Sequence, residues 1–464
     1  MQGRVDGSPD YVAVVGGGLA GLAAACALAD CGFRVTLFER RPYLGGRASS
    51  YEHPGTGEVV DNCQHVLFKL CTNLIDFYRR IGIENKIQWF DRMTFIEPGG
   101  RQSRLASTLL PPPMHAMPAF MGFKFLTLND KLRLASALNA LITRVPKDDG
   151  SSFQDWLHKH HQTPAAIERF WKPILVSALS EDLDRISVPY AAQVVRESMK
   201  SREARLMGVP MIPLTHLYDA ARDYIVARGG QVRLRESIQS FLSMDTGVRI
   251  RLQDSEEQFD FAVLAVPFDS LAKLIPDSGD SQVLREKLSQ FKTAPITGIH
   301  LWFDRKISDL PHAVLLDRTV QWMFHKSELL DKNATGSYIE LVVSSSKSLL
   351  NKPRQEIIDL ALKEVREFFP AARDANLVKA TVIKEVNATF SPRPGIDQHR
   401  PTQRTQWPRL FLAGDWTATG WPATMEGAVR SGYMAAEAIT KSTGKPKTFV
   451  VSDLPAKGFM RLFP

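Results

Sequence analysis

The chain has 464 residues, of which 44% are hydrophobic and 23% charged, so it can form two or three packed domains and is too apolar for a disordered protein. Its net charge of +8 leaves both nucleic acid and a membrane surface open as partners. The four cysteines include no C-x-x-C pair, which excludes a disulfide framework and a structural zinc site and fits a reducing compartment.

The first predicted elements lie in an uncharged run, residues 11–29, that imitates a membrane span or a signal peptide. Both interpretations are rejected, because three glycines stand near its start and charge returns at Asp30. We predict instead a βαβ unit: a buried strand over Tyr11–Val15, a helix over residues 22–30 and a second strand over residues 34–38. The chain is therefore expected to be cytoplasmic, with membrane contact only from its surface.

The turn inside this unit has the pattern G-x-G-x-x-G at Gly16, Gly18 and Gly21. The first glycine permits a tight turn, the second lets a pyrophosphate approach the backbone, and the third allows the helix to pack on the strand. Glu39, 18 residues after Gly21, can accept both ribose hydroxyl hydrogens. A glycine-rich turn without function is the alternative, but the order strand, helix, strand and acid favours dinucleotide binding.

The residues after the acid favour a flavin over a nicotinamide cofactor. Gly46 lets the backbone approach the dinucleotide, and Arg47 offers a guanidinium to the pyrophosphate. Arg40, directly after Glu39, is a further candidate for cofactor binding.

The next segment, residues 109–125, contains no acid and one lysine, and its prolines prevent a continuous helix. It is either a loop over the core, or the mouth of an apolar tunnel or a surface that dips into a membrane. Further on, we predict a helix over residues 215–228 with Thr215 as its N-cap, and a strand over residues 248–252.

Near the end of the chain, a buried strand over residues 409–413 leads into Gly414 and Asp415. A helix beginning near Met425 could direct its positive N-terminus at the negative charge of a reduced flavin. Asp415 alone would more often cap a turn. The tail, residues 443–464, mixes basic and apolar residues, which suits an anionic membrane but equally a flexible tail.

Together the segments GGGLAG, LGGR and LFLAGDWT resemble the superfamily of FAD-containing amine oxidases and carotenoid desaturases. The resemblance implies FAD as cofactor, with Glu39 at the adenosine ribose, Arg47 along the cofactor, Asp415 at the ribityl or pyrophosphate portion and Ile238 at the adenine.

The implied fold is α/β, a Rossmann-like FAD-binding domain of the amine oxidase type with an inserted mixed α+β substrate domain. We expect a discontinuous FAD-binding domain from residues 1–60, 205–290 and 405–442. Residues 61–204 and 291–404 then form a substrate domain with an apolar tunnel, and residues 443–464 form the tail.

Residues 60–67 and 420–432 resemble the squalene-associated branch, the hydroxysqualene dehydroxylases of bacterial hopanoid synthesis. This implies reductive removal of the hydroxyl of hydroxysqualene, giving squalene and oxidised FAD. Amine oxidases commonly carry a lysine on a strand facing the flavin, and the comparable residues 294–302 contain none. An isoprenoid desaturase and a non-catalytic lipid-binding relative remain as alternatives.

Dehydroxylation requires an acid, an apolar environment for an allylic cation and a hydride from the reduced flavin. Asp61 and His65 are the candidate acids, although Asp61 could cap a turn and His65 could be a core histidine. The group His158, His160 and His161 lacks a carboxylate, so we expect no metal site.

The expected partners follow from the same features. They are an isoprenoid lipid substrate, the inner face of the cytoplasmic membrane as a peripheral contact, and a separate electron donor, because the sequence has one dinucleotide fingerprint. Nucleic acid is not expected.

Overall fold

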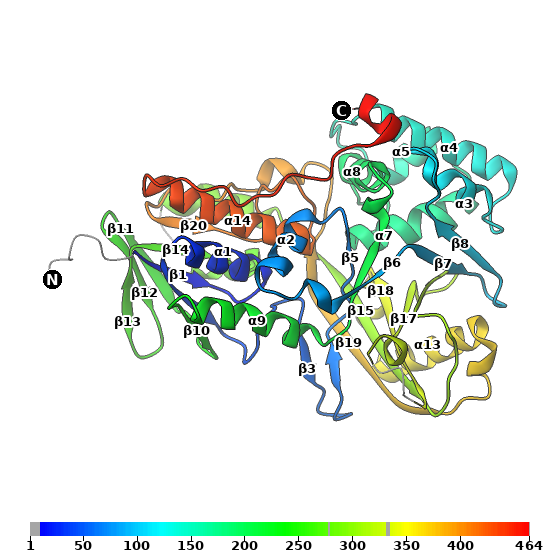
Figure 1. Cartoon of the computed structure of the whole chain (residues 1–464), viewed down its shortest axis with the longest axis horizontal. Coiled ribbons are helices and arrows are strands. Elements are labelled where there is room, and N and C mark those ends of the chain that lie inside the picture. The colour runs from blue at the N-terminus through cyan, green and yellow to red at the C-terminus, as the bar shows by residue number, and fades with distance from the viewer. Residues whose placement is uncertain (1–9, 277–278, 331–334, 464) are drawn as a thin grey trace.

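The computed structural model describes residues 10–276, 279–330 and 335–463. Figure 1 shows two regions side by side along the longest axis of the molecule, each built around its own sheet. The predicted α/β fold with a Rossmann-like sheet is confirmed.

The first region contains a five-stranded sheet whose strands are all parallel, in the order β10-β2-β1-β14-β20. Its strands are β1 (Tyr11–Val15), β2 (Arg34–Glu39), β10 (Gln231–Leu234), β14 (Phe261–Leu264) and β20 (Leu410–Leu412). They come from three distant parts of the chain. Parallel strands need cover on both faces, and most of these residues are buried as that rule requires.

One face of this sheet is covered by the helices α1 (Leu19–Asp30), α9 (Leu214–Val226) and α14 (Met425–Ser442), and α2 (Thr72–Arg80) packs against α14. Figure 1 shows α1 and α14 lying along each other. Their backbones approach closely, because a side chain at Gly432 would overlap the carbonyl of Ala20. All residues of α1 except Asp30 are buried, which explains why this helix is apolar on every side.

The other face packs on a small antiparallel sheet of β11 (Ser240–Met244), β12 (Gly247–Arg251) and β13 (Glu256–Phe259). The predicted strand at 248–252 is β12, shifted by one residue. The N-cap predicted at Thr215 is wrong, since α9 begins at Leu214 after Pro213. The Thr215 hydroxyl instead bonds both backbone groups of Ser50, each at 2.7 Å, and ties α9 to β3 (Ser50–Glu52).

The second region contains a seven-stranded sheet in the order β19-β15-β18-β17-β16-β7-β8, in which the β16 and β7 pair is parallel and the other pairs are antiparallel. Its strands are β7 (Arg92–Ile96), β8 (Gln102–Ala106), β15 (Thr293–Phe303), β16 (His312–Leu315), β17 (Trp322–His325), β18 (Ser337–Ser344) and β19 (Leu377–Phe390). Helix α13 (Arg354–Phe368) packs on one face of this sheet.

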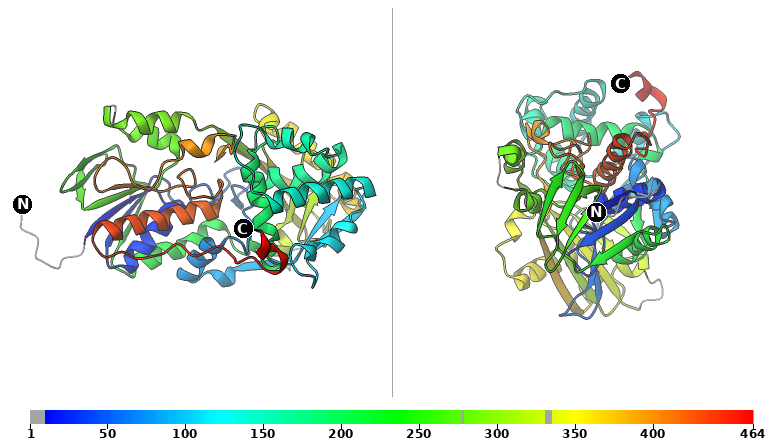
Figure 2. Two further views of the ribbon diagram at one scale, coloured as in Figure 1. Left: turned by 90° about the horizontal axis from the view of Figure 1, so that it is seen from above. Right: turned by 90° about the vertical axis from the view of Figure 1, so that its left-hand side faces the viewer.

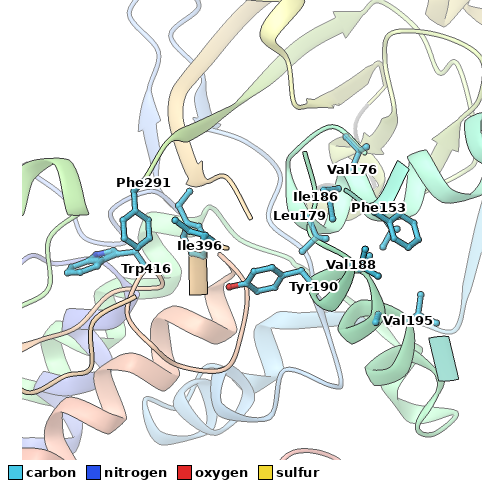
Figure 3. Close-up of a cluster of buried hydrophobic side chains, with 14 of the residues drawn as sticks. Phe153, Val176, Leu179, Ile186, Val188, Tyr190, Val195, Phe291, Ile396 and Trp416 are labelled. Atoms are coloured by element: carbon cyan, nitrogen blue, oxygen red, sulfur yellow. The ribbon is translucent and has the colours of Figure 1, made fainter. Parts of the chain in front are cut away.

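A helical layer covers the other side of the second region. Its helices are α3 (Met117–Met121), α4 (Leu128–Thr143), α5 (Phe153–Lys159), α6 (Pro164–Ala166), α7 (Lys172–Leu179) and α8 (Val188–Met199). The largest apolar cluster runs from this layer, through Tyr190, to Phe291 and Trp416 beside the first region (Figure 3). One continuous core therefore joins the helical layer to the parallel sheet.

Shorter elements connect the two regions. They are β4 (Val59–Asp61), β5 (Leu67–Phe68), β6 (Ile87–Phe90), β9 (Met207–Pro210), α10 (Phe268–Leu274), α11 (Gln282–Ser289) and α12 (Lys326–Leu330). After α14 the tail runs back along the molecule to the end of α8 (Figure 2), where Lys457 N–H donates to Lys200 O. The flexible-tail alternative is wrong, because Met460 is buried in the main core. In the parts of the chain that the structure describes, no helix is long and apolar enough to cross a membrane.

Candidate active site

A cavity of about 540 Å³ lies at the carboxyl ends of β1 and β2, the place where open α/β sheets bind ligands. Its wall includes most of the residues that the sequence singled out, namely Gly16, Gly18, Glu39, Arg40, Gly46, Arg47, His65, Ile238, Gly414, Asp415 and Met425. Gly21 and Asp61 lie behind the wall. Segments up to about 400 residues apart in sequence thus meet at one site.

The three glycines of the turn occupy different environments. Gly16 has a φ of 110°, and a Cβ there would lie 2.5 Å from Ala265 O. A Cβ at Gly21 would overlap the carbonyl of Gly16, so α1 can pack on the turn only without a side chain there. At Gly18, the N-cap of α1, the nearest atom to a Cβ would be Gly46 Cα at 3.8 Å, which leaves room for a ligand. The first N–H groups of α1 have no intrahelical acceptor and suit phosphate oxygens.

Glu39 is fixed at the end of β2 by two backbone donors. Gly17 N–H donates to its Oε2 and Arg41 N–H to its Oε1, both at 2.7 Å. Each carboxylate oxygen keeps a lone pair for a further donor, so two ribose hydroxyls could be bound. Together with the open turn and the cavity, these acceptor oxygens fit the adenosine half of FAD.

Arg47 and Asp415 are paired with each other across the cavity wall. Arg47 Nη2 lies 2.5 Å from Asp415 Oδ1, and its Nη1 donates to Ala388 O at 3.0 Å. The guanidinium is therefore already engaged, which differs from the expectation of a guanidinium free for the pyrophosphate. Behind Asp415, the buried Arg400 donates to the carbonyls of Asp415 and Thr417 and fixes this loop. Sequence reasoning missed Arg400, which carries no local motif.

The start of α14 reaches the cavity through Met425 and Ala428. Thr424 caps the helix by accepting from Gly427 N–H at 3.1 Å. Glu426 in the first turn points away, accepting from Leu74 N–H at 2.8 Å. The helix N-terminus is thus placed beside the cavity as predicted, with a buried carboxyl on its far side.

Asp61 is placed poorly for the acid role that the sequence suggested. Its Oδ2 accepts from Lys326 Nζ at 2.7 Å, and its Oδ1 accepts from Ser50 Oγ and from Leu214 N–H. Burial alone would raise the pKa of Asp61, but Lys326 and these donors hold it below its usual value. An ionised carboxylate outside the cavity does not donate a proton to a substrate inside it, so the geometry argues against Asp61 as the acid.

His65 lines the cavity and has a defined tautomer. Its Nδ1 lies 2.7 Å from Cys63 O, and because a carbonyl oxygen only accepts, Nδ1 carries the hydrogen. Burial lowers the pKa of His65 from its usual 6.5, so the ring is neutral at pH 7 with a lone pair on Nε2. The geometry suits a proton acceptor better than the proton donor expected from the sequence.

The cavity wall also contains polar residues that sequence reasoning missed. Glu385 and Thr389 of β19 face the same cavity as His65. The Thr389 hydroxyl has no hydrogen-bond partner among the described residues. Of the three histidines at 158, 160 and 161, His160 stacks on Trp156, with 3.9 Å between the ring centroids. No cluster of three potential metal ligands occurs within the described ranges.

Residues 19–440 match the family described as flavin containing amine oxidoreductase. The chain is 27% identical to 15-cis-phytoene desaturase from Synechococcus elongatus, over 94% of this chain and 98% of the relative. It is 25% identical to zeta-carotene desaturase from Synechocystis, over 95% of this chain and 99% of the relative.

Solved structures share the fold at lower identity. Putrescine oxidase bound to putrescine gives a TM-score of 0.72 at 16% identity, covering 94% of this chain and 99% of that chain. Cyclohexylamine oxidase from Brevibacterium oxydans gives 0.69 at 16% identity, covering 94% and 100%.

Proposed function

Because this chain belongs to the flavin containing amine oxidoreductase family, we propose that it oxidises an isoprenoid chain with its flavin, as a carotenoid-type desaturase does. The chain is an FAD-dependent oxidoreductase, and the FAD cofactor predicted from the sequence is confirmed. Relatives named phytoene and zeta-carotene desaturases match nearly the whole chain, which supports an isoprenoid substrate and desaturation. Dehydroxylation of hydroxysqualene, the reaction expected first from the sequence, becomes the second candidate.

The observation that carries the proposal is the neutral ring of His65 in the cavity wall, with its hydrogen on Nδ1 and a lone pair on Nε2. Desaturation removes a hydride from one carbon and a proton from its neighbour, leaving a double bond. FAD, when bound, supplies the two-electron acceptor for the hydride. His65 accepts the proton at Nε2, and Cys63 O stabilises the imidazolium through Nδ1–H. The electrons then leave on a separate redox carrier, which replaces the separate donor expected for dehydroxylation.

The residues around the cavity define how FAD would be held. We propose that Gly16, Gly18, Gly21 and the start of α1 receive the pyrophosphate, that Glu39 binds the adenosine ribose, and that Ile238 lies at the adenine. We further assign to the cofactor site Arg40, Gly46, the Arg47 and Asp415 pair, Gly414 and Met425. Residues 1–60, 205–290 and 405–442 are proposed to form the FAD-binding domain, and residues 61–204 and 291–404 the substrate domain.

The second candidate has its own support in the structure. Residues 62–66, within the segment 60–67 that resembles hydroxysqualene dehydroxylases, form part of the cavity wall. Dehydroxylation needs a proton donor, and His65 is protonated only below its lowered pKa. We therefore expect any dehydroxylation to be favoured at acidic pH.

An exposed apolar surface suggests where the lipid is supplied. Leu109 is 86% exposed and Leu462 is 70% exposed, and the two segments are joined because Phe459 N–H donates to Pro112 O at 2.8 Å. Met114, Met117, Met121 and Phe459, which belong to the same two segments, are also exposed. We propose that this surface docks on the anionic inner face of the cytoplasmic membrane, with Arg461 close by for the headgroups.

The membrane proposal is tested by sedimentation with anionic vesicles. Replacing Leu109 and Leu462 with Asp should abolish binding, and high salt should weaken it. As a control, replacing Val283, which is 65% exposed on α11, with Asp should leave binding unchanged. Equal binding by the two variants would contradict the proposal.

The reaction is tested with anaerobic holoenzyme and product analysis. Oxidised enzyme mixed with phytoene should lose its flavin absorbance and form a product with an additional double bond. Reduced enzyme mixed with hydroxysqualene should remain reduced. Reoxidation of the flavin with formation of squalene would instead establish the second candidate.

A further inference from the structure

Behind the cavity wall lies a buried group of three ionisable residues that the proposed reaction does not use. Asp61 ends β4, Lys326 begins α12, and Glu340 lies in the middle of β18. Their side chains are 5%, 3% and 0% exposed, respectively. A charged side chain at this depth destabilises the folded protein unless it is paired with an opposite charge or hydrogen-bonded.

Lys326 is the centre of the group. Its Nζ lies 2.7 Å from Asp61 Oδ2, 2.9 Å from Gln64 Oε1 and 3.5 Å from Glu340 Oε2, so three oxygens surround an ammonium with three hydrogens. Gln64 in turn donates from Nε2 to His65 O at 3.1 Å. Lys326 thus holds both ends of the turn formed by residues 61–64, which leads directly into His65.

At pH 7 the positive charge of Lys326 is balanced by the negative charge of Asp61 alone. Burial raises the pKa of Glu340 to about 8, so this carboxyl carries a proton at pH 7 while Asp61 stays ionised. The ionisable side chains around Glu340 are Lys326, Asp61, Cys63, Tyr338 and His300, which pairs directly opposite on β15. Burial lowers the pKa of His300 to about 3, so His300 is neutral.

We propose that Lys326 is a positioning residue of the active site, holding the turn at 61–64 so that His65 presents its free Nε2 to the cavity. The inference rests on the proposed role of His65. Lys326 does not line the cavity, so it acts through Asp61 and Gln64. Burial is the main cause of the lowered pKa of His65, and the positive charge of Lys326 acts in the same direction.

The proposal is tested by measuring the His65 pKa in holoenzyme with isotope-labelled histidine, its NMR signal assigned with His65→Gln. Lys326→Met should raise the pKa of His65, because a nearby positive charge is removed while Asp61 remains. The acid limb of the kcat profile should move by the same amount, with kcat reduced about tenfold at pH 7 and KM changed less than twofold. Lys352→Met, which removes an exposed lysine paired with Glu356, should change none of these.

A second variant covers the case in which Lys326→Met does not accumulate. Gln64→Leu cuts the link between Lys326 and the turn but keeps the ion pair with Asp61, and it should lower kcat with little loss of stability. An unchanged His65 pKa in Lys326→Met, or an unchanged kcat in Gln64→Leu, would overturn the positioning role. The NMR measurement needs no substrate, so its result stands even if the enzyme turns over none of the tested isoprenoids.

Discussion

The buried carboxyl of Glu340 should make the free energy of unfolding depend on pH. Replacing Glu340 with Gln should remove this contribution to the pH dependence. In the unfolded chain this carboxyl ionises near pH 4.5, whereas in the folded protein it keeps its proton up to about pH 8. Its contribution to stability is complete below pH 4.5 and is lost as the pH rises to about 8. The shift of about 3.5 units corresponds to about 5 kcal/mol at most, at about 1.4 kcal/mol per unit.

Glu340→Gln keeps the shape of the protonated acid and cannot ionise. We therefore expect this variant to match the wild type near pH 4.5 and to exceed its free energy of unfolding by about 3–5 kcal/mol at pH 8 and above. Urea unfolding of the holoenzyme, followed by circular dichroism between pH 4.5 and 9, measures the difference. Ionisation of other groups is common to both proteins and cancels.

A matched control is Glu364→Gln, because Glu364 is also buried but accepts hydrogen bonds from Thr319 N–H and Val320 N–H. Loss of its charge should destabilise the protein by about 1.5–3 kcal/mol. The two substitutions thus have opposite signs at pH 8. A difference between Glu340→Gln and wild type that does not change between pH 4.5 and 9 would refute the assignment of a proton to Glu340.

The remaining predictions concern the cofactor and the reaction. Gly21→Ala should yield colourless protein without FAD absorbance, because the new Cβ overlaps the Gly16 turn, whereas Gly279→Ala, which meets no atom within 4 Å, should retain FAD. Glu39→Gln should weaken FAD binding about tenfold in equilibrium titration of apoprotein, since a charged acceptor is about 1.5 kcal/mol better than a neutral one. His65→Gln should lower the rate of flavin reduction by substrate about 100-fold in stopped-flow absorbance, and an unchanged rate would exclude His65 as the base. Glu385→Gln should slow the same step if the cavity carboxylate stabilises a developing cation, and an unchanged rate would assign it a packing role.

The parts of the site that the sequence could predict are those whose function depends on local spacing. The glycine turn, Glu39 and the start of α14 each follow from residues within one βαβ unit or one helix, where periodicity and turn chemistry act over short distances. The parallel pairing of β1 with β2 was predictable for the same reason.

The contacts that define the chemistry were not predictable, because they join distant segments. Asp61 and Lys326 are 265 residues apart, and Arg47 and Asp415 are 368 apart. Nothing in the sequence near Asp61 indicates a buried lysine partner, so Asp61 appeared available as an acid. The tautomer of His65 likewise depends on the fold of its turn, which brings Nδ1 to Cys63 O. Threonine is a common N-cap residue, but the Thr215 hydroxyl donates to Ser50 O and does not cap α9.

Because α14 packs closely on α1, folding of this region cannot finish until α14 has been synthesised. Helix α1 is apolar on all sides, and the helix that covers it is synthesised about 400 residues later. At about 5–20 residues per second, on the order of 20–80 s pass before α14 exists. During that interval the nascent chain carries an uncovered apolar helix beside an unfinished FAD site. Cofactor insertion should therefore follow the end of translation, and folding in the cell should depend on chaperones that shield the first thirty residues until the last forty arrive.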